Sequence, residues 1–258
     1  MPATPTPTPS PPKNPIVLIP ARLDASRLPD KVLADIGGVP MVVQAWRRGM
    51  EAGIGPVIVA AGDRKIADAV EKAGGKAVLT DPDLPSGSDR IHQALARLDP
   101  DRTYDAVVNL QADLPNIGPA QIKAAFELLS DPAVDIGTLA AEIVNPEDRD
   151  NPNAVKAVVP FAAGARQGRA LYFTRATAPS GEGPLYHHFG LYAYRRAALE
   201  RFVTLPPGIL EQRERLEQLR ALEAGMRIDV ALIDSVPLEV NTPADLERAR
   251  ATLARGTA

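Results

Sequence analysis

Residues 16–22 read IVLIPAR, and residues 26–31 read SRLPDK. The run IVLI is short, apolar and rich in β-branched side chains, which is typical of a fully buried strand in a parallel sheet. Three cations, Arg22, Arg27 and Lys31, follow it in one short loop. Open α/β sheets bind ligands at the carboxyl ends of their strands, and guanidinium and ammonium groups suit a polyphosphate. The alternative is a basic loop that is merely solvated, although two prolines stiffen its ends.

The composition limits the classes of protein that fit. A chain of 258 residues suits one large α/β domain. Its net charge of −3 predicts neither a nucleic-acid partner nor binding to an anionic membrane. The chain has no cysteine and three histidines, so we expect no disulfide framework, thiolate nucleophile or structural zinc site. No apolar run approaches the length of a membrane span.

Residues 1–14 are rich in threonine and proline. This segment has too few apolar side chains to fold and lacks the apolar core of a secretory signal. It predicts a disordered tail before a single domain over 15–258, and by default a cytoplasmic location.

Short apolar runs alternate with helical segments as far as residue 110. A proline opens the helix expected over 40–52, and Asp63 can cap a helix that two glycines stop near residue 73. Another helix begins within 86–90. The expected strands cover 57–61, 76–79 and 105–110, with a short extended piece over 32–36. This alternation predicts an open, mostly parallel, doubly wound sheet with right-handed crossovers.

The pattern changes near residue 135, where strand-like segments follow one another with few helices between them. They predict a mixed α/β insertion over about 136–225, which we expect to build a homodimer. Its expected strands cover 136–144, 154–160, 170–173 and 188–195. A leucine-striped helix is expected over 211–224, a strand over 227–233, and a last helix from Thr242-Pro243.

Two segments of the first half have both a functional and a plainer explanation. Exposed N–H groups within 86–90, SGSDR, can receive a base edge or a phosphate, but an ordinary helix cap explains them as well. Asp113 follows a buried strand, across the sheet edge from the cations. A carboxylate facing a polyphosphate suggests a divalent cation between them; the alternative is a turn residue.

The second half offers further polar candidates. His188 would share one strand face with Gly190, Tyr192 and Tyr194, and a structural role fits it as well as a functional one. Arg175 is similarly ambiguous. Glu217 and Gln218 adjoin the leucine stripe, where a solvated surface is the ordinary explanation.

Taken in order, these segments resemble the CMP-Kdo synthetases, or 3-deoxy-manno-octulosonate cytidylyltransferases. The resemblance extends essentially from Asn14 to Arg250. The matching stretches are PAR (20–22), RLP (27–29), Lys31, SGSDR (86–90), NLQ (109–111), NPNAVK (151–156), ALYFTRA (170–176), HFGLY (188–192), LEQLR (216–220) and TPADLE (242–247). The first stretch is shared with many sugar nucleotidyltransferases, whereas YFTRA and LEQLR are specific to the Kdo branch.

The resemblance implies an enzyme that joins CTP to the acidic sugar Kdo, giving CMP-Kdo and pyrophosphate for lipopolysaccharide assembly. Such a step needs positioning and charge neutralisation more than covalent chemistry. The implied nucleotide-binding residues are Pro20, Ala21, Arg22, Arg27, Lys31, Ser86, Gly87, Arg90 and Gln111. The implied sugar-binding residues are Arg175, which would pair with the carboxylate, and His188, Tyr192, Glu217 and Gln218. Mg²⁺ would be held by Asp113 and residue 241, and Arg22, Lys31 and Asp113 would act in catalysis.

Four places depart from the family pattern. They are Asn241 for an aspartate, Ala112 and Asp30 for glycines, and Gly208-Ile209 for Ser-Pro. An asparagine keeps an oxygen but loses the charge that a hard cation prefers. Glu239 lies two residues earlier, on the same face of an extended strand, and its longer side chain could reach the ion. The departures leave open a weakened enzyme or a CTP-binding paralogue, and Arg175 would also suit another acidic sugar, such as an amino-Kdo or a sialic-acid-like sugar.

Overall fold

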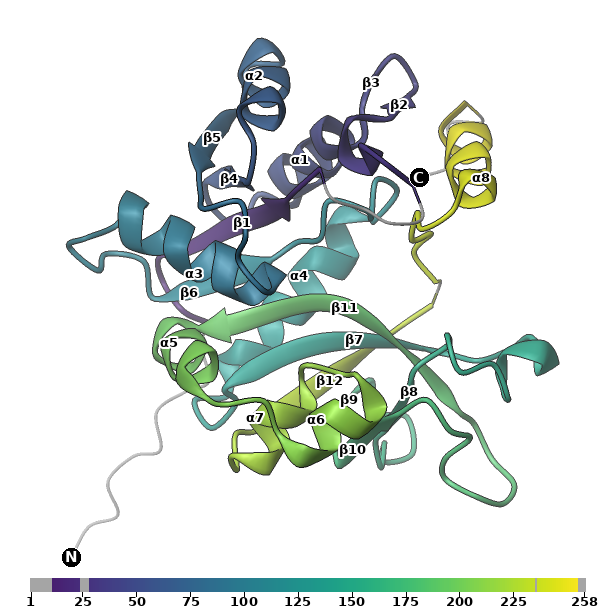
Figure 1. The fold of residues 1–258 in the computed structure, drawn as a ribbon. Coiled ribbons are helices and arrows are strands. Elements are labelled where there is room, and N and C mark those ends of the chain that lie inside the picture. Colours follow the sequence, from purple (N-terminus) through teal and green to yellow (C-terminus); the bar gives the residue numbers. More distant parts are fainter. Residues whose placement is uncertain (1–10, 24–27, 235, 255–258) are drawn as a thin grey trace, which may run out of the picture.

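The computed structural model describes residues 11–23, 28–234 and 236–254. In this part of the chain one ten-stranded sheet runs through the molecule, with helices on both faces (Figure 1). Its main strands lie in the order β5-β4-β1-β6-β11-β7-β12-β9, and β8 and β10 extend it beside β11. Among the described residues, no helix is long and apolar enough to cross a membrane.

The elements follow the expected alternation through the first half and the expected mixture in the second. The strands are β1 (Pro15–Ala21), β2 (Asp35–Ile36), β3 (Val39–Pro40), β4 (Val57–Ala61), β5 (Lys76–Leu79), β6 (Ala106–Asn109), β7 (Ile136–Glu142), β8 (Lys156–Val158), β9 (Gln167–Arg169), β10 (Tyr172–Thr174), β11 (Tyr186–Arg195) and β12 (Ile228–Ile233). The α-helices are α1 (Met41–Ala52), α2 (Arg64–Lys72), α3 (Gly87–Leu98), α4 (Pro119–Glu127), α5 (Arg196–Thr204), α6 (Ile209–Glu214), α7 (Leu219–Glu223) and α8 (Pro243–Ala254). Short 3₁₀ turns are η1 (Lys31–Leu33), η2 (Leu128–Ser130) and η3 (Pro146–Asp148).

The first four strands of the sheet, β5, β4, β1 and β6, are parallel. The chain passes outward from β1 to β4 and β5, and then returns to place β6 on the other side of β1. Because the strand order reverses at β1, the carboxyl ends of β1 and β6 border a topological switch point. Ligands of open α/β sheets bind at such points, and this edge carries the sequence motifs singled out above.

Strands β7, β11 and β12 continue the same sheet. β11 lies antiparallel between β6 and β7, and β12 runs parallel to β7. The segment expected as a mixed insertion therefore supplies strands to the main sheet, and the end of β11, residues 192–195, lies directly beside β6.

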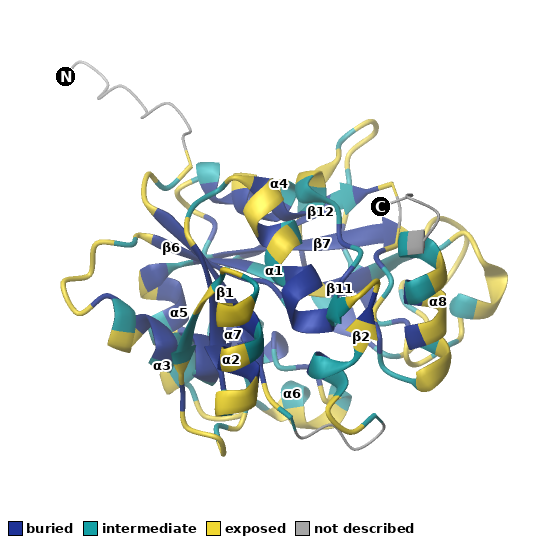
Figure 2. Cartoon of the chain, turned by 90° about the horizontal axis from the view of Figure 1, so that it is seen from above, coloured by how far each residue is buried: buried dark blue, intermediate teal, exposed yellow. Residues whose placement is uncertain are grey.

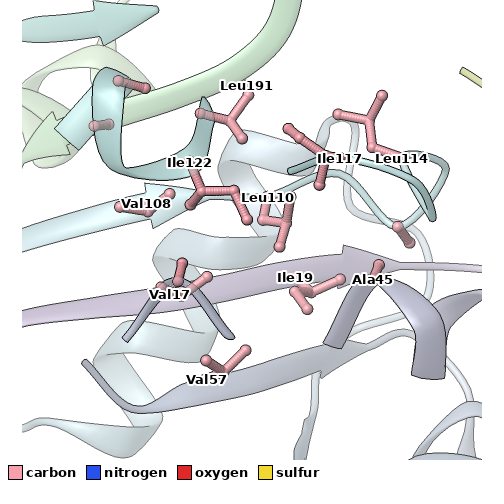
Figure 3. Close-up of a cluster of buried hydrophobic side chains, with 14 of the residues drawn as sticks. Val17, Ile19, Ala45, Val57, Val108, Leu110, Leu114, Ile117, Ile122 and Leu191 are labelled. Atoms are coloured by element: carbon pink, nitrogen blue, oxygen red, sulfur yellow. The ribbon is translucent and has the colours of Figure 1, made fainter. Parts of the chain in front are cut away.

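Alternation along β1 separates two hydrophobic cores. Val17 and Ile19 face a cluster that includes α1, α2 and α4 (Figure 3), whereas Ile16 and Leu18 face a cluster with α3, α5 and α7. All four side chains are completely buried, and burying each contributes about 1.5–3 kcal/mol. The view from above in Figure 2 shows the buried strands between partly exposed helices. This packing confirms the α/β fold class predicted from the sequence.

A third, smaller cluster joins the loop after β1 to the last helix. It contains Ile36, Met41, Val240, Leu246 and Ala249. Figure 1 shows α8, in yellow, beside β2 and β3. The C-terminal helix thus supports the segment that carries Lys31.

Two local expectations are wrong. The extended piece over 32–36 is a 3₁₀ turn over Lys31–Leu33 followed by the two-residue strand β2. The helix expected over 211–224 is broken into α6 and α7, because Arg215 adopts a left-handed conformation with φ 57° and ends α6. The leucine stripe persists across the break, since Leu216 and Leu219 are both buried.

Candidate active site

A cavity of about 330 Å³ opens at the carboxyl ends of β1 and β6. Its walls come from the end of β1, the loop before α1, the start of α3, the loop after β6, and Asn241. The lining residues are Pro20, Ala21, Arg22, Leu28, Lys31, Val32, Leu84, Ser86, Gly87, Arg90, Gln111, Ala112, Asp113 and Asn241. Every described residue predicted for the nucleotide or the metal ion lines this cavity, and the remaining one, Arg27, lies outside the described residues.

Lys31 links two other polar residues of the cavity wall. Its Nζ donates to Asp113 Oδ2 at 2.9 Å and to Asn241 Oδ1 at 3.3 Å. Asp30, immediately before it, has φ 54°. This left-handed conformation accounts for a family glycine at that position, and aspartate is one of the few other residues that tolerate it.

The oxygens of Asp113 and Asn241 converge on the Lys31 ammonium, so positive charge already lies where both point. Among the described residues no group of three or more His, Cys, Asp or Glu side chains forms a metal cage. Mg²⁺ is commonly held by one or two carboxylates together with substrate phosphates and water. One carboxylate and one amide oxygen beside a cation-lined cavity are a donor set that fits such a shared site.

The start of α3 forms another part of the cavity wall. Ser86 caps the helix by accepting a hydrogen bond from the N–H of Asp89 at 3.1 Å. A Cβ on Gly87 would lie 3.3 Å from Pro20 and 3.7 Å from Gln111 Oε1, so glycine permits a close approach between this turn and both strand ends. The first N–H groups of α3 therefore lie beside the cavity.

Arg90 lines the same cavity with a fixed guanidinium group. The side chain is 2% exposed, and it donates to Thr80 Oγ1 at 2.6 Å and to the carbonyls of Asp81 and Pro82 at 2.9 Å. Burial, with a smaller effect of the Arg22 charge, lowers the pKa of Arg90 from its ordinary value. Arg90 thus fixes the loop after β5 while contributing positive charge to the pocket.

A second cavity, of about 250 Å³, adjoins the first. Gly87, Gln111 and Asp113 line both cavities. The remaining walls of the second are Ser88, Asn109, Leu114, Phe189, Gly190, Tyr192, Glu217 and Glu239.

Two predicted sugar-binding residues, Tyr192 and Glu217, line this second cavity. Burial raises the pKa of Tyr192 well above its ordinary value, so the phenol stays protonated and can donate. Burial also raises the pKa of Glu217, whose Oε2 accepts from Ser88 Oγ at 3.1 Å. Glu217 thereby connects the start of α3 to the segment after α6.

The other three predicted sugar-binding residues line neither cavity. His188 is 8% exposed, and its Nε2 lies 3.0 Å from Thr138 Oγ1. Burial lowers the pKa of His188 to about 3, so the ring is neutral near pH 7. Gln218 is also buried, and its Nε2 has no hydrogen-bond partner among the described residues.

Arg175 is held by backbone carbonyls. Its guanidinium donates to Glu214 O at 2.7 Å, to Pro152 O at 3.0 Å and to Arg215 O at 3.4 Å. These bonds tie the end of β10 to α6 and to the loop before β8. Its pairing with a sugar carboxylate stays a prediction.

Sequence reasoning missed Thr138, whose hydroxyl lies within 3.1 Å of the carbonyls of Phe189 and Leu191. The register between β7 and β11 shifts there, between Phe189 and Tyr192. The predicted common face survives for the aromatic rings, since His188 packs near Tyr192 and Tyr192 near Tyr194. Gly190, within the irregularity, is exposed. The sequence of β7 contains no turn or charge pattern that indicates such a role for Thr138.

Two departures from the family pattern have local explanations. Ala112 is buried and is not among the described residues with positive φ, so its backbone does not need glycine there. At Gly208, a Cβ would lie 2.2 Å from Glu223 Oε1. The Glu223 carboxylate instead accepts from the N–H groups of Ile209 and Leu210 at 2.9 Å. A carboxylate from α7 therefore caps α6, and glycine leaves room for it.

Comparison with known proteins agrees with this arrangement. The cytidylyltransferase family model matches residues 16–228. The 3-deoxy-manno-octulosonate cytidylyltransferase of Rhodospirillum centenum is 66% identical over 242 residues, which cover 94% of each chain. The protein of the same name from Parvibaculum lavamentivorans is 65% identical over 242 residues, covering 94% of this chain and 93% of the relative.

Solved structures agree as well. The structure of CMP:2-keto-3-deoxy-manno-octonic acid synthetase complexed with CTP is 37% identical, with a TM-score of 0.87, and the match covers 95% of this chain and 100% of the other. A nucleotidyl transferase from Methanothermobacter thermautotroptrophicus shares the fold at 18% identity and a TM-score of 0.60, covering 94% and 99%. The family suggested by the sequence motifs is thus confirmed. The chain belongs to the cytidylyltransferase family and, within it, to the 3-deoxy-manno-octulosonate cytidylyltransferases.

Proposed function

We propose that this enzyme transfers the cytidylyl group of CTP to Kdo, giving CMP-Kdo and pyrophosphate. The observation that carries the proposal is the pair of adjoining cavities that share Gly87, Gln111 and Asp113. A nucleotide in the cation-lined cavity and a sugar in the cavity beside Tyr192 and Glu217 meet at that shared wall. Holding two reactants at one boundary supplies most of what such a transfer needs.

In the reaction, the anomeric 2-hydroxyl oxygen of Kdo forms a bond to the α-phosphorus of CTP. The bond from that phosphorus to the oxygen bridging to the β-phosphate breaks, and pyrophosphate leaves with the electron pair. The hydroxyl proton is released with the products. Negative charge spreads over the phosphate oxygens during this step, so fixed cations beside them lower the barrier.

Arg22 and Lys31 supply that positive charge. Lys31 is 14% exposed at its side chain and is preorganised by two acceptors, Asp113 and Asn241. An ammonium group held in this way needs little reorganisation when a triphosphate enters. The Ser86–Gly87 turn offers backbone N–H groups to the nucleotide, and Gln111, whose Nε2 donates to Asn109 Oδ1 at 2.7 Å, presents its Oε1 beside Gly87.

Mg²⁺ completes the proposed site. Asp113 and Asn241 would hold it, and when bound it would neutralise phosphate charge as a Lewis acid. On the sugar side, the protonated Tyr192 and the carboxylate of Glu217 are the polar groups available to hydroxyls.

The experiment is a pyrophosphate-release assay with Mg²⁺, in which CTP is compared with UTP, ATP and GTP, and Kdo with an amino-Kdo and a sialic acid. We expect release only with CTP, and fastest with Kdo. Calorimetric titration without sugar should show tighter binding of CTP than of the other nucleotides. Equal binding of all four would remove base recognition, and binding of CTP without turnover of any acidic sugar would indicate a non-catalytic protein.

A further inference from the structure

A line of polar side chains runs from the nucleotide cavity to the sugar cavity. Asp113 accepts from Lys31, Lys31 donates also to Asn241 Oδ1, and Asn241 Nδ2 donates to Glu239 Oε1 at 2.6 Å. Its last member, Glu239, lies at the wall of the second cavity together with Asp113. The line thus has a carboxylate at each end and a neutral amide between Lys31 and Glu239.

The two ends of the Asn241 amide have different partners, and this fixes its orientation. Its oxygen faces the Lys31 ammonium, and its nitrogen faces the Glu239 carboxylate. The backbone is held as well, since the N–H of Asn241 donates to Asp245 Oδ2 at 3.0 Å and the N–H of Val240 donates to Asp113 O at 3.0 Å. The segment 239–241 is therefore anchored directly against the candidate cation site.

The candidate Mg²⁺ site formed by Asp113 and Asn241 has one negative charge fewer than the family pattern, which has an aspartate at position 241. Asp113 is a carboxylate, but Asn241 offers only a neutral oxygen, and Mg²⁺ affinity depends on the number of charged ligands. Of the described residues that line the two cavities, the carboxylates besides Asp113 are Glu217 and Glu239. Glu217 accepts a hydrogen bond from Ser88 on α3. Glu239 instead accepts a hydrogen bond from Asn241, and Lys31 donates to both Asn241 and Asp113.

We propose that Glu239 is the second carboxylate ligand of Mg²⁺ in this enzyme, and that Asn241 orients it. This inference rests on the proposed function, because it assumes a Mg²⁺–CTP complex in the first cavity. Glu239 then supplies the charge that the amide of Asn241 lacks. The same carboxylate borders the sugar cavity, so the ion would be held at the boundary where the two substrates meet.

Binding of Mn²⁺ in place of Mg²⁺ tests the proposal without turnover. Free Mn²⁺ is measured by electron paramagnetic resonance, with CTP present and sugar absent. In Glu239→Gln we expect the Mn²⁺ dissociation constant of the CTP complex to rise about tenfold, because one of two charged ligands is removed. In EDTA the same variant should bind CTP at least as tightly as the native enzyme, since a negative charge beside the triphosphate is gone.

A second substitution separates a ligand from a merely structural residue. In the Glu239→Gln/Asn241→Asp double variant the carboxylate removed at position 239 is replaced by one at position 241. We expect the Mn²⁺ affinity of this variant to return to within a few-fold of the native value. Glu127→Gln is the matched control, because Glu127 is an exposed carboxylate at the end of α4 that lines neither cavity. Circular dichroism and the unfolding midpoint verify that each variant is folded.

Unchanged Mn²⁺ affinity in Glu239→Gln overturns the proposal, and so does weaker CTP binding by that variant in EDTA, which would show a structural role. Failure of the double variant to recover Mn²⁺ affinity also counts against it. Failure of the proposed function is a separate result, since it would appear as absent pyrophosphate release by the native enzyme with Kdo.

Discussion

At the scale of single residues, Lys31 joins polar side chains in the wall of the first cavity. It connects the loop after β1 with Asp113 from the loop after β6 and with Asn241 before α8. Three segments distant in sequence therefore converge on one ammonium group. An ion pair that is largely withdrawn from solvent is screened less by salt than a surface pair, so its charge is well placed to act on a phosphate.

Replacing Lys31 tests whether that charge acts on the transition state. We expect Lys31→Ala to lower kcat by on the order of a hundredfold or more, because a preorganised cation is lost where charge develops. Steady-state kinetics with saturating CTP and Kdo measure the effect, and Lys123→Ala, an exposed lysine on α4, is the control. A rise in the KM for CTP with unchanged kcat would limit Lys31 to ground-state binding.

The convergence of the residues predicted for the nucleotide on one cavity could be anticipated, because they lie in short contiguous motifs at the ends of neighbouring strands. The turn at 86–90 carries a helix cap, and a cap is a local signal. No local sequence signal indicates the surroundings of His188, because its partner Thr138 lies 50 residues away on a neighbouring strand. Burial changes a residue's chemistry in the same non-local way: the low pKa of His188 follows from the packing of β11, which composition does not encode.

At the scale of elements, α5 is fastened to the end of α3 by a buried ion pair. Asp99, which is 4% exposed, accepts from the guanidinium of Arg196, from the N–H of Tyr104 at 2.9 Å and from both the N–H and the hydroxyl of Thr103. Burial alone would raise the pKa of Asp99, but these hydrogen bonds outweigh it and hold the pKa well below its usual 3.8. The pair fixes the helix that begins where β11 ends.

Removing this charge should destabilise the fold in a pH-dependent way. We expect Asp99→Asn to cost about 3 kcal/mol of unfolding free energy at pH 7, because it removes the buried partner of Arg196 and leaves this guanidinium only the more exposed Glu200 carboxylate. A carboxylate with a depressed folded-state pKa contributes stability above its unfolded pKa and loses it as the pH falls towards the folded value. The difference between native and variant should therefore shrink below pH 3.8.

Urea unfolding at a series of pH values measures this difference, with Asp101→Asn, at an exposed position, as the control. If the difference in unfolding free energy between native and Asp99→Asn protein did not change with pH, the stabilisation by Asp99 would come from its shape and not from its charge.

Prediction from sequence worked better for elements with strong end signals than for those without them. The helices over Arg64–Lys72 and Gly87–Leu98 begin at Asp63 and Ser86, whose side chains cap them as expected. The break between α6 and α7 was missed because Arg215 is a non-glycine residue in a left-handed conformation, which sequence does not mark. The parallel half of the sheet followed from alternating strands and helices, whereas the place of β11 between β6 and β7 depends on long-range pairing.

At the scale of the whole molecule, the segment 28–41, which carries Lys31, packs against the last helix in a small hydrophobic cluster outside the two main cores. Their cluster contains Ile36, Met41, Val240, Leu246 and Ala249, and Arg250 Nε donates to the carbonyl of Asp35 at 2.9 Å. Both Lys31 and Asn241 border this cluster in sequence. Small clusters with few buried side chains open at a lower free energy than a main core does, so we expect the segments that carry Lys31 and Asn241 to open more easily than the sheet.

Truncating one side chain in each place tests this separation. Leu246 is 7% exposed in the small cluster, and Leu129 is completely buried in the core on the α1 and α4 face. Each change to alanine removes buried methyl groups, at a cost of about 2–5 kcal/mol where the surroundings cannot collapse.

In Leu246→Ala we expect this loss to appear as faster amide exchange over 28–41 and 240–253 and weaker CTP binding, with a smaller change in the free energy of global unfolding. Leu129→Ala should instead lower the global unfolding free energy and leave CTP affinity near its native value under folding conditions. Hydrogen exchange followed by mass spectrometry, with calorimetric titration of CTP, measures both. Uniformly faster exchange throughout Leu246→Ala would show that α8 unfolds only together with the sheet, and the site would then have no stability of its own.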